Sequence, residues 1–195
     1  MIFISFFCLN AQTIKNYGVK FGIAASNPIW EVGSRSMSGV QTKYGIDFGI
    51  FADWSLSNKL FITSELHFVQ KGLKAEFGNA DSIFNSDYPS INYLSIPITL
   101  KYTLNDYEVE PYILIGPRID FAISKKETNW STYVYKNTKD VDFGMNIGVG
   151  VQTKAFLGFG TGLELRYCPS FTKVDSSIQG DIKNRTYEIN LFIYR

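Results

Sequence analysis

The residues best suited to acid–base or nucleophilic chemistry are Glu65 and His67, a pair that includes the only histidine of the chain. They stand two positions apart, so on a β-strand their side chains share one face. An imidazole beside a carboxylate could activate a nucleophile such as Ser95, but sequence alone does not place a serine beside this pair. We therefore expect His67 to be a hydrogen-bonded residue inside the fold and the protein not to be an enzyme.

Residue types that hold metals or cofactors are scarce. Besides the single histidine the chain has two cysteines, Cys8 and Cys168, and otherwise only scattered carboxylates. Zinc sites need clustered His and Cys ligands, and calcium sites need several closely spaced oxygen ligands. We expect no catalytic residues, no metal site and no cofactor.

Length and composition limit the class of protein. The 195 residues suffice for one domain, and 19 basic against 18 acidic residues give a formal net charge of +1. No long run of either charge appears, which argues against nucleic acid as a partner. No uncharged stretch after the N-terminus reaches the roughly 18 residues of a membrane helix. The many aromatic residues and 16 glycines favour β structure.

Hydrophobic alternation with a period of two recurs along the chain. It predicts strands at 16–26, 43–54, 59–71, 92–103, 109–123, 140–153, 156–168 and 185–194. Long connections alternate with short ones that carry turn residues such as Asn58 and Asn105. Strands joined by short turns are antiparallel, so we expect an up-and-down meander of these strands.

Each predicted strand has an apolar face and a polar face. In 43–54, for example, Ile46, Phe48 and Ile50 alternate with the residues of the polar face. Every strand carries at least one ionisable group on the polar face: Lys20, Asp47, Asp53, Glu65, His67, Lys101, Glu110, Arg118, Asp120, Asp142, Glu164, Arg166 and Glu188.

Glycine indicates which face points inward. The strand glycines all share the polar face: Gly18, Gly22, Gly45, Gly49, Gly116, Gly144, Gly148, Gly150, Gly158, Gly160 and Gly162. Glycine weakens a solvated strand, whereas inside a narrow barrel it makes room for charged side chains and permits bending. We therefore expect an all-β, eight-stranded antiparallel up-and-down transmembrane β-barrel with its apolar face toward lipid. The alternative is a soluble lipocalin-like barrel that carries a lipophilic ligand against an inward apolar face.

Aromatic residues near the strand ends favour the membrane alternative. They are Tyr17, Tyr44, Trp54, Phe68, Tyr102, Phe121, Tyr167 and Tyr187. Barrels that cross a bilayer carry such aromatic girdles at both interfaces. The pattern predicts a protein of the bacterial outer membrane, with long loops outside the cell and short turns in the periplasm.

The charges inside such a barrel should pair, because an unpaired buried charge costs several kcal/mol. We expect a structural charge network that plugs the lumen: Lys20, Asp47, Glu65, Lys101, Glu110, Arg118, Asp120, Asp142, Glu164, Arg166 and Glu188. Arg118 and Arg166 should be its hubs, since one guanidinium can hold two carboxylates. An eight-stranded lumen is only wide enough for side chains, which excludes a general porin and leaves narrow cation conduction as an alternative.

The beginning of the chain is typical of an export signal. Met1 to Ala11 is an apolar run that ends in a small residue, like the end of a truncated secretory signal peptide. We expect residues 1–11 to be cleaved, which removes Cys8, and residues 12–195 to form one barrel domain.

Several segments together resemble the PorT-like outer membrane β-barrel domain of Bacteroidota. The matching segments are Tyr17 to Gly22 (YGVKFG), Leu60 to Gly72 (LFITSELHFVQKG), Tyr93 to Tyr102 (YLSIPITLKY), Pro111-Tyr112 and Gly116-Pro117. The resemblance runs from Tyr17 to the C-terminus and implies this fold and this location. Because the founding member is linked to secretion and gliding machinery, it also implies a possible accessory role in secretion or transport.

The long connections carry aromatic residues that could anchor a protein partner: Trp30, Tyr88, Trp130, Tyr133 and Tyr135. Packing on one another over the barrel mouth is the competing interpretation. We expect a monomeric, non-enzymatic barrel that contacts outer membrane lipid and acts structurally or through a partner at these loops. A secretion or transport component and a soluble carrier are the other hypotheses.

Overall fold

The fold is all-β in the part of the chain that the computed structural model describes. This part comprises residues 14–27, 29–32, 35–36, 40–72, 74–77, 85–87, 90–105, 107–126, 139–153, 158–173 and 181–195. Within these residues no helix has the length and hydropathy needed to cross a bilayer. The expected signal peptide, residues 1–11, lies outside the described residues, as do Tyr88, Trp130, Tyr133 and Tyr135. Trp30 belongs to a short strand of which only the backbone is described.

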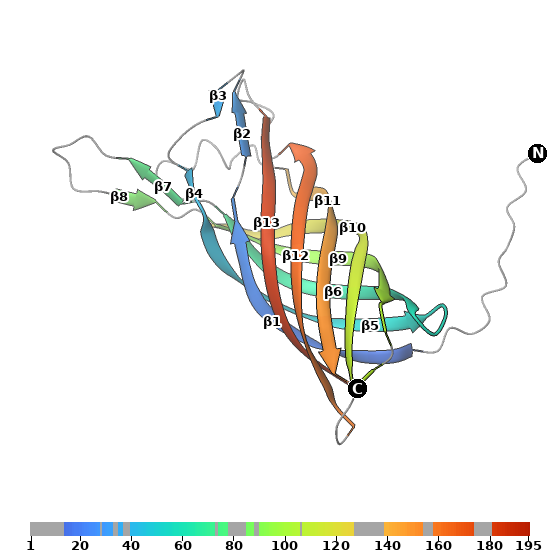
Figure 1. Cartoon of the computed structure of the whole chain (residues 1–195). Helices are drawn as coiled ribbons and strands as arrows, with labels where there is room; N and C mark the ends of the chain where they lie inside the picture. The colour runs from blue at the N-terminus through green and yellow to red at the C-terminus, as the bar shows by residue number, and fades with distance from the viewer. Residues whose placement is uncertain are drawn as a thin grey trace, which may run out of the picture.

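Eight long strands among the described residues form a closed antiparallel barrel (Figure 1). They are β1 (Ile14–Ser26), β5 (Lys43–Ser55), β6 (Leu60–Gly72), β9 (Ser90–Thr103), β10 (Val109–Lys126), β11 (Val141–Thr153), β12 (Gly160–Lys173) and β13 (Asp181–Tyr194). Each strand pairs with its neighbour in chain order, and β1 also pairs with β13, so that Phe21 lies opposite Leu191. This closure confirms the expected eight-stranded up-and-down barrel and leaves no unpaired edge in the wall.

The position of β12 differs from the sequence prediction. The alternation predicts a strand at 156–168, whereas the strand begins at Gly160 and ends at Lys173. Gly158 accounts for the difference, because its φ of 88° places it in an exposed turn and not on the polar face of a strand. The strand then continues beyond the predicted end, with Phe171 exposed on the outer face.

The two ends of the barrel differ in their connections. Short connections, 56–59, 104–108 and 154–159, lie at the end where β1 begins and β13 finishes, which we call the turn end. Long connections, 27–42, 73–89, 127–140 and 174–180, lie at the opposite end, which we call the loop end. This alternation of long and short connections is the one that the sequence predicts.

Short strands extend the structure at the loop end (Figure 1). They are β2 (Ile29–Val32), β3 (Arg35–Ser36), β4 (Val40–Gln41), β7 (Lys74–Phe77) and β8 (Asn85–Asp87). β2 pairs with the start of β13, and β4, β7 and β8 form a separate sheet. Sequence analysis assigns these segments to loops, because two to four residues are too few to show a period of two.

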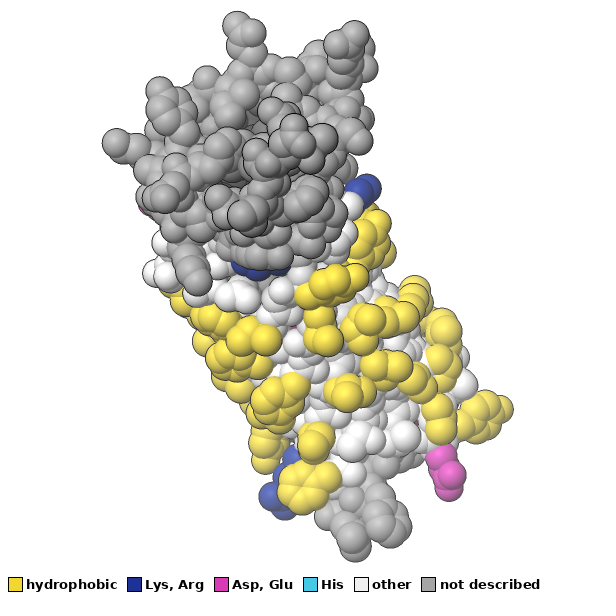
Figure 2. Space-filling model, turned by 90° about the vertical axis from the view of Figure 1, so that its left-hand side faces the viewer, with side chains coloured by type: hydrophobic (Ala, Val, Ile, Leu, Met, Phe, Trp, Pro, Cys, Tyr) yellow, Lys and Arg dark blue, Asp and Glu magenta, His cyan; other side chains and the backbone are white. Residues whose placement is uncertain are grey.

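Most large apolar residues of the barrel strands are exposed on the outer wall. Ile46, Ile50, Ile147 and Leu191 are all exposed on the outer wall, whereas charged residues of the same strands are buried inside. Figure 2 shows apolar side chains over the wall of the barrel, with charged side chains near its two ends. The soluble alternative requires apolar side chains inside and a polar outer face, so this arrangement contradicts it.

Aromatic side chains flank the outer wall toward both ends. Tyr17 and Tyr102 are exposed toward the turn end, and Tyr44 is exposed toward the loop end. Also toward the loop end, Tyr167 and Tyr187 lie side by side with ring centroids 5.2 Å apart. This is the distribution expected of interfacial girdles.

Candidate functional site

The centre of the lumen holds two basic and two acidic side chains in mutual contact. The ammonium group of Lys20 lies 3.0 Å from Glu65 and 3.1 Å from Glu164. Arg166 contacts the same two carboxylates, with Nη2 at 2.6 Å from Glu65 and Nε donating to Glu164. The hydroxyl of Tyr112 donates to Glu164 at 2.7 Å. All these groups are buried inside the barrel. Bulk water therefore screens the ion pairs between them only a little.

His67 extends this central cluster. Its Nδ1 lies 2.6 Å from Asp47, and its Nε2 lies 2.9 Å from Glu65. Both ring nitrogens therefore face carboxylate oxygens, and only the doubly protonated imidazole can donate from both. Ser95 lies opposite His67 in the strand register, and its hydroxyl hydrogen-bonds to Asp120. The two ring nitrogens of His67 lie against carboxylates, as in an ion cluster.

A second cluster lies toward the loop end. Lys71 reaches Asp120 at 2.5 Å, and Nε of Arg118 lies 3.0 Å from the same carboxylate. The two terminal nitrogens of Arg118 donate to Asn146 at 3.3 Å and to Ser170 at 3.4 Å. Arg118 thus holds one carboxylate directly.

Asp142 joins this second cluster through a hydroxyl. Ser170 donates to Asp142 at 2.6 Å, and Asn184 donates to the same oxygen at 3.4 Å. Glu188 is buried in the same half of the lumen, and no ion pair or hydrogen bond of its carboxylate is seen within the described residues. Opposite charges compensate the loop-end acids less completely than those at the centre.

A third cluster lies at the turn end. Lys101 pairs with Asp53 at 2.9 Å and donates to Gln152 at 2.8 Å. Gln152 in turn donates to Glu110 at 2.7 Å. Thr63 also donates to Asp53, at 2.6 Å. The amide of Gln152 therefore connects Glu110 to the lysine that pairs directly with Asp53.

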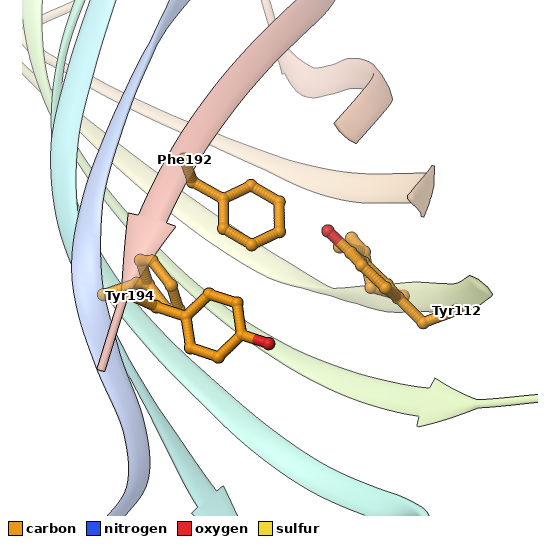
Figure 3. Close-up of a cluster of buried hydrophobic side chains, with 5 residues drawn as sticks. Tyr112, Phe192 and Tyr194 are labelled. Atoms are coloured by element: carbon orange, nitrogen blue, oxygen red, sulfur yellow. The ribbon is translucent and has the colours of Figure 1, made fainter. Parts of the chain in front are cut away.

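Aromatic rings close the lumen beside this third cluster (Figure 3). The rings of Phe51 and Phe192 meet edge to face with centroids 5.6 Å apart. Tyr112 and Tyr194 also contact Phe192, with centroid distances of 6.5 Å and 6.0 Å. Together with Leu114 they form the buried apolar cluster of the lumen, which we call the aromatic cluster. Such packing excludes water from the turn end.

Each ring of this cluster lies opposite a glycine on a neighbouring strand. Phe51 pairs with Gly18 and Tyr112 with Gly150 in the strand register. In the same way, β12 places Gly162 opposite Phe192 and Gly160 opposite Tyr194. A methyl group at Gly162 would overlap the ring of Phe192. The inward glycines therefore provide the space that the large side chains occupy.

Large polar side chains follow the same arrangement. His67 lies opposite Gly49, Arg118 opposite Gly144 and Arg166 opposite Gly148. The glycines of the polar face thus make room in the narrow lumen for the large side chains opposite them.

The structure brings together most of the site residues that sequence analysis proposes. Lys20, Asp47, Glu65, Lys101, Arg118, Asp120, Asp142, Glu164, Arg166 and Glu188 are buried in the lumen, and Glu110 is half-buried. Arg166 holds two carboxylates as expected of a hub, whereas Arg118 holds one, because Asn146 and Ser170 occupy its other nitrogens. Lys20 is the second basic residue that contacts two carboxylates, those of Glu65 and Glu164.

The sequence pattern does not lead us to predict Lys71 or the aromatic cluster as part of the lumen. Both could have been found by parity, since Lys71 shares the face of Glu65 and His67, and Phe192 shares that of Glu188. Among the described residues no group of three or more His, Cys, Asp or Glu side chains could hold a metal ion. Cys168 is buried and has a free thiol.

Comparison with protein families gives a match to a family described as an outer membrane protein beta-barrel domain, over residues 10–176. Comparison with curated protein sequences gives no match. Among solved structures, the chain is similar to Neisserial surface protein A with a TM-score of 0.52 and 13% identity, covering 91% of this chain and 95% of that one. At this identity the likeness shows the fold.

Two further solved structures are similar over nearly their full length. The attachment invasion locus protein Ail of Yersinia pestis matches with 15% identity and a TM-score of 0.42, covering 94% of this chain and 100% of that one. The N-terminal β-barrel domain of Pseudomonas aeruginosa OprF matches with 10% identity and a TM-score of 0.40, covering 90% of this chain and 97% of that one.

Proposed function

The chain belongs to the family of outer membrane protein beta-barrel domains, and from this premise we propose that it is a non-enzymatic barrel whose closed lumen stabilises the protein in the membrane. Its location is the bacterial outer membrane. The long connections at the loop end face the outside of the cell and are the part available to a protein partner. In this proposal the strands form an inert, rigid support, and specificity belongs to the loops.

The observation that carries this proposal is the series of paired charges and packed rings buried in the lumen. Three charge clusters follow one another along the axis, centred on Lys101, on Arg166 and on Arg118. The aromatic cluster occupies the turn end. A pore needs a connected water path, which packed rings interrupt.

A catalytic role has little support from the same geometry. The imidazole of His67 is buried between Asp47 and Glu65, and these carboxylates occupy both of its nitrogens. A general base needs to reach the proton of a substrate or nucleophile. The imidazole of His67 has no such access, which supports a structural role for Glu65 and His67.

Narrow cation conduction is the second candidate function. Among the described residues, the buried carboxylates outnumber the buried Lys and Arg side chains: Asp47, Asp53, Glu65, Asp120, Asp142, Glu164 and Glu188 against Lys20, Lys71, Lys101, Arg118 and Arg166. An acidic lumen favours cations over anions. The PorT-like role as an accessory component of secretion or transport stays a prediction from the sequence resemblance.

Single-channel recording in planar bilayers separates the first two functions. We expect the wild-type barrel to show no discrete openings in KCl. The variant Phe192→Ala removes the ring at the centre of the aromatic cluster and should permit small cation-selective currents. The matched control is Phe143→Ala, which removes an exposed ring from the outer wall and should leave the bilayer silent. Stable cation openings of the wild-type protein would reject the closed-lumen proposal in favour of the channel.

Loop binding is tested independently of conduction. Wild-type protein should bind host or bacterial surface proteins through the loop end, and replacing all of Trp30, Tyr88, Trp130, Tyr133 and Tyr135 with serine should abolish that binding. The barrel of this variant should still show the heat-dependent SDS mobility of a folded barrel. Binding that survives the replacement would remove these aromatics from the proposal.

A further inference from the structure

The outer wall contains an apolar groove near the turn end. Its volume is about 560 Å³, and it crosses four neighbouring strands, β11, β12, β13 and β1. The residues that define its course are Val151, Thr161, Leu163, Leu191, Ile193 and Phe21. This volume lies in the range of small-molecule sites.

The shape of the groove follows from the strand register. Ile193 lies opposite Thr161, and Leu191 lies opposite Leu163. Gly162 stands between the two β12 residues and has no side chain, and it lines the groove together with Phe192. Leu163 and Leu191 also line the hollow.

The lining of the groove includes Thr153 and Thr161, which stand near the turn end of β11 and β12. Their hydroxyl oxygens lie 3.3 Å apart. Polar groups thus meet the groove only where the wall approaches the membrane interface. The chemical groups of a bilayer follow the same order, from the hydrocarbon core to the ester groups and the headgroups.

A cation stands beyond this polar end. Leu191 and Ile193 are exposed on the outward face of β13, and Arg195, which directly follows the strand, continues this alternation and is exposed. Its backbone is held by two hydrogen bonds of 2.9 Å with Tyr17 of β1. A guanidinium at this level of the membrane matches the charge of a lipid phosphate.

We propose that the groove binds one phospholipid of the periplasmic leaflet, with an acyl chain along Leu163 and Leu191 and its phosphate at Arg195. The occupant follows from the surroundings, since a hollow in a lipid-facing wall is filled by hydrocarbon and not by water. The site rests on the membrane location of the barrel and is independent of whether the lumen conducts.

Native mass spectrometry tests the site. The full barrel is inserted into vesicles of phosphatidylethanolamine and phosphatidylglycerol, extracted in mild detergent and activated by collisions until loosely bound lipid is lost. Wild-type protein should retain one phospholipid per barrel. Leu163→Trp fills the groove with an indole, and retention should fall about tenfold, as for a pocket whose volume is taken by a side chain.

Leu100→Trp is the matched control. Leu100 is 43% exposed on β9, against 40% for Leu163, and does not line the groove. This control should retain the lipid as the wild type does. If Leu163→Trp fails to give the heat-dependent SDS mobility of a folded barrel, Val151→Phe fills the same hollow with a smaller ring.

The headgroup contact has its own readout. Arg195→Gln should lower the retention of phosphatidylglycerol but leave the retention of diacylglycerol, which has no phosphate, unchanged. Equal lipid retention by Leu163→Trp and Leu100→Trp would overturn the proposal. So would a mass of two barrels that only Leu163→Trp dissociates, because the groove would then be an interface between copies of the chain.

Discussion

The two faces of the barrel strands follow different rules, although they alternate along the same residues. On the outer wall the neighbours are fluid lipid chains, so Ile46 or Leu191 needs only to be apolar. In the lumen every neighbour is fixed, and a side chain such as Arg166 needs particular partners at particular distances.

The glycines express the same difference. Phe192 fits inside because Gly162 lies opposite it, whereas Phe121 on the outer wall is exposed and needs no such space. The outer face is therefore tolerant of size and intolerant of charge, whereas the inner face is sensitive to size and accepts a charge only where a partner is in place. Each prediction below changes one face in a way that the other would accept.

The largest effect is expected when the central cluster loses its arginine. Arg166→Met leaves Glu164 with Lys20 and Glu65 with Lys20 and His67, and breaking a buried pair in this way costs about 3 to 5 kcal/mol. Urea unfolding in lipid vesicles measures the change. In the background Glu65→Gln/Glu164→Gln the same substitution should cost much less, because the uncompensated charges are gone. An equal cost in both backgrounds would assign the effect to packing instead of charge.

The next largest effect is expected from a charge on the outer wall. Ile147 is exposed at the middle of β11, and Ile147→Lys should destabilise the barrel by about 2 to 4 kcal/mol, as for lysine near the bilayer midplane. The yield of heat-modifiable protein after refolding into vesicles reports the loss. Ile147→Val keeps the wall apolar and serves as the control. Normal insertion of the lysine variant would reverse the assignment of inner and outer faces.

A methyl group inside the lumen should have a smaller effect. At Gly162 it overlaps the ring of Phe192, and overpacking of this kind costs about 1 to 3 kcal/mol. Gly162→Ala should therefore lower the urea midpoint, and the pair Gly162→Ala/Phe192→Leu should recover part of the loss relative to Phe192→Leu alone. Additive effects of the two substitutions would mean that the contact between them is not the cause.

The sequence pattern predicts the barrel well because the outer face depends only on residue type. Alternation locates seven of the barrel strands within a few residues, and it errs at β12, where the turn at Gly158 depends on backbone conformation. It also identifies most lumen charges by parity. The sequence rule is that the face with the glycines and the charges points inward. It holds in the structure for the strand glycines opposite Arg118 and Arg166.

Partner choice within the lumen could not be predicted from the pattern. Arg118 and Arg166 each pair with a carboxylate two residues away on their own strand, but Arg166 also pairs with Glu65 across the barrel. The difference depends on how far each strand is shifted along its neighbour, and residue types do not encode that register directly. Parity places the rings of the aromatic cluster in the lumen, but the contacts between them depend on the same register, which sets a glycine opposite each ring.

The smallest predicted effect concerns a neutral link in the loop-end cluster. Ser170 accepts a hydrogen bond from Arg118 and donates one to Asp142, so Ser170→Ala leaves a buried cation and a buried anion each short of one bond. The expected cost is about 1 to 2 kcal/mol, since the remaining bond from Asn184 to Asp142, at 3.4 Å, is long. Ser124→Ala, on an exposed residue of β10, should change the urea midpoint little. The substitution Asp142→Asn removes the anion that Ser170 serves, so the cost of Ser170→Ala should shrink in that background. If it does not, Ser170 acts through Arg118 alone, and Asp142 is held by residues other than this hydroxyl.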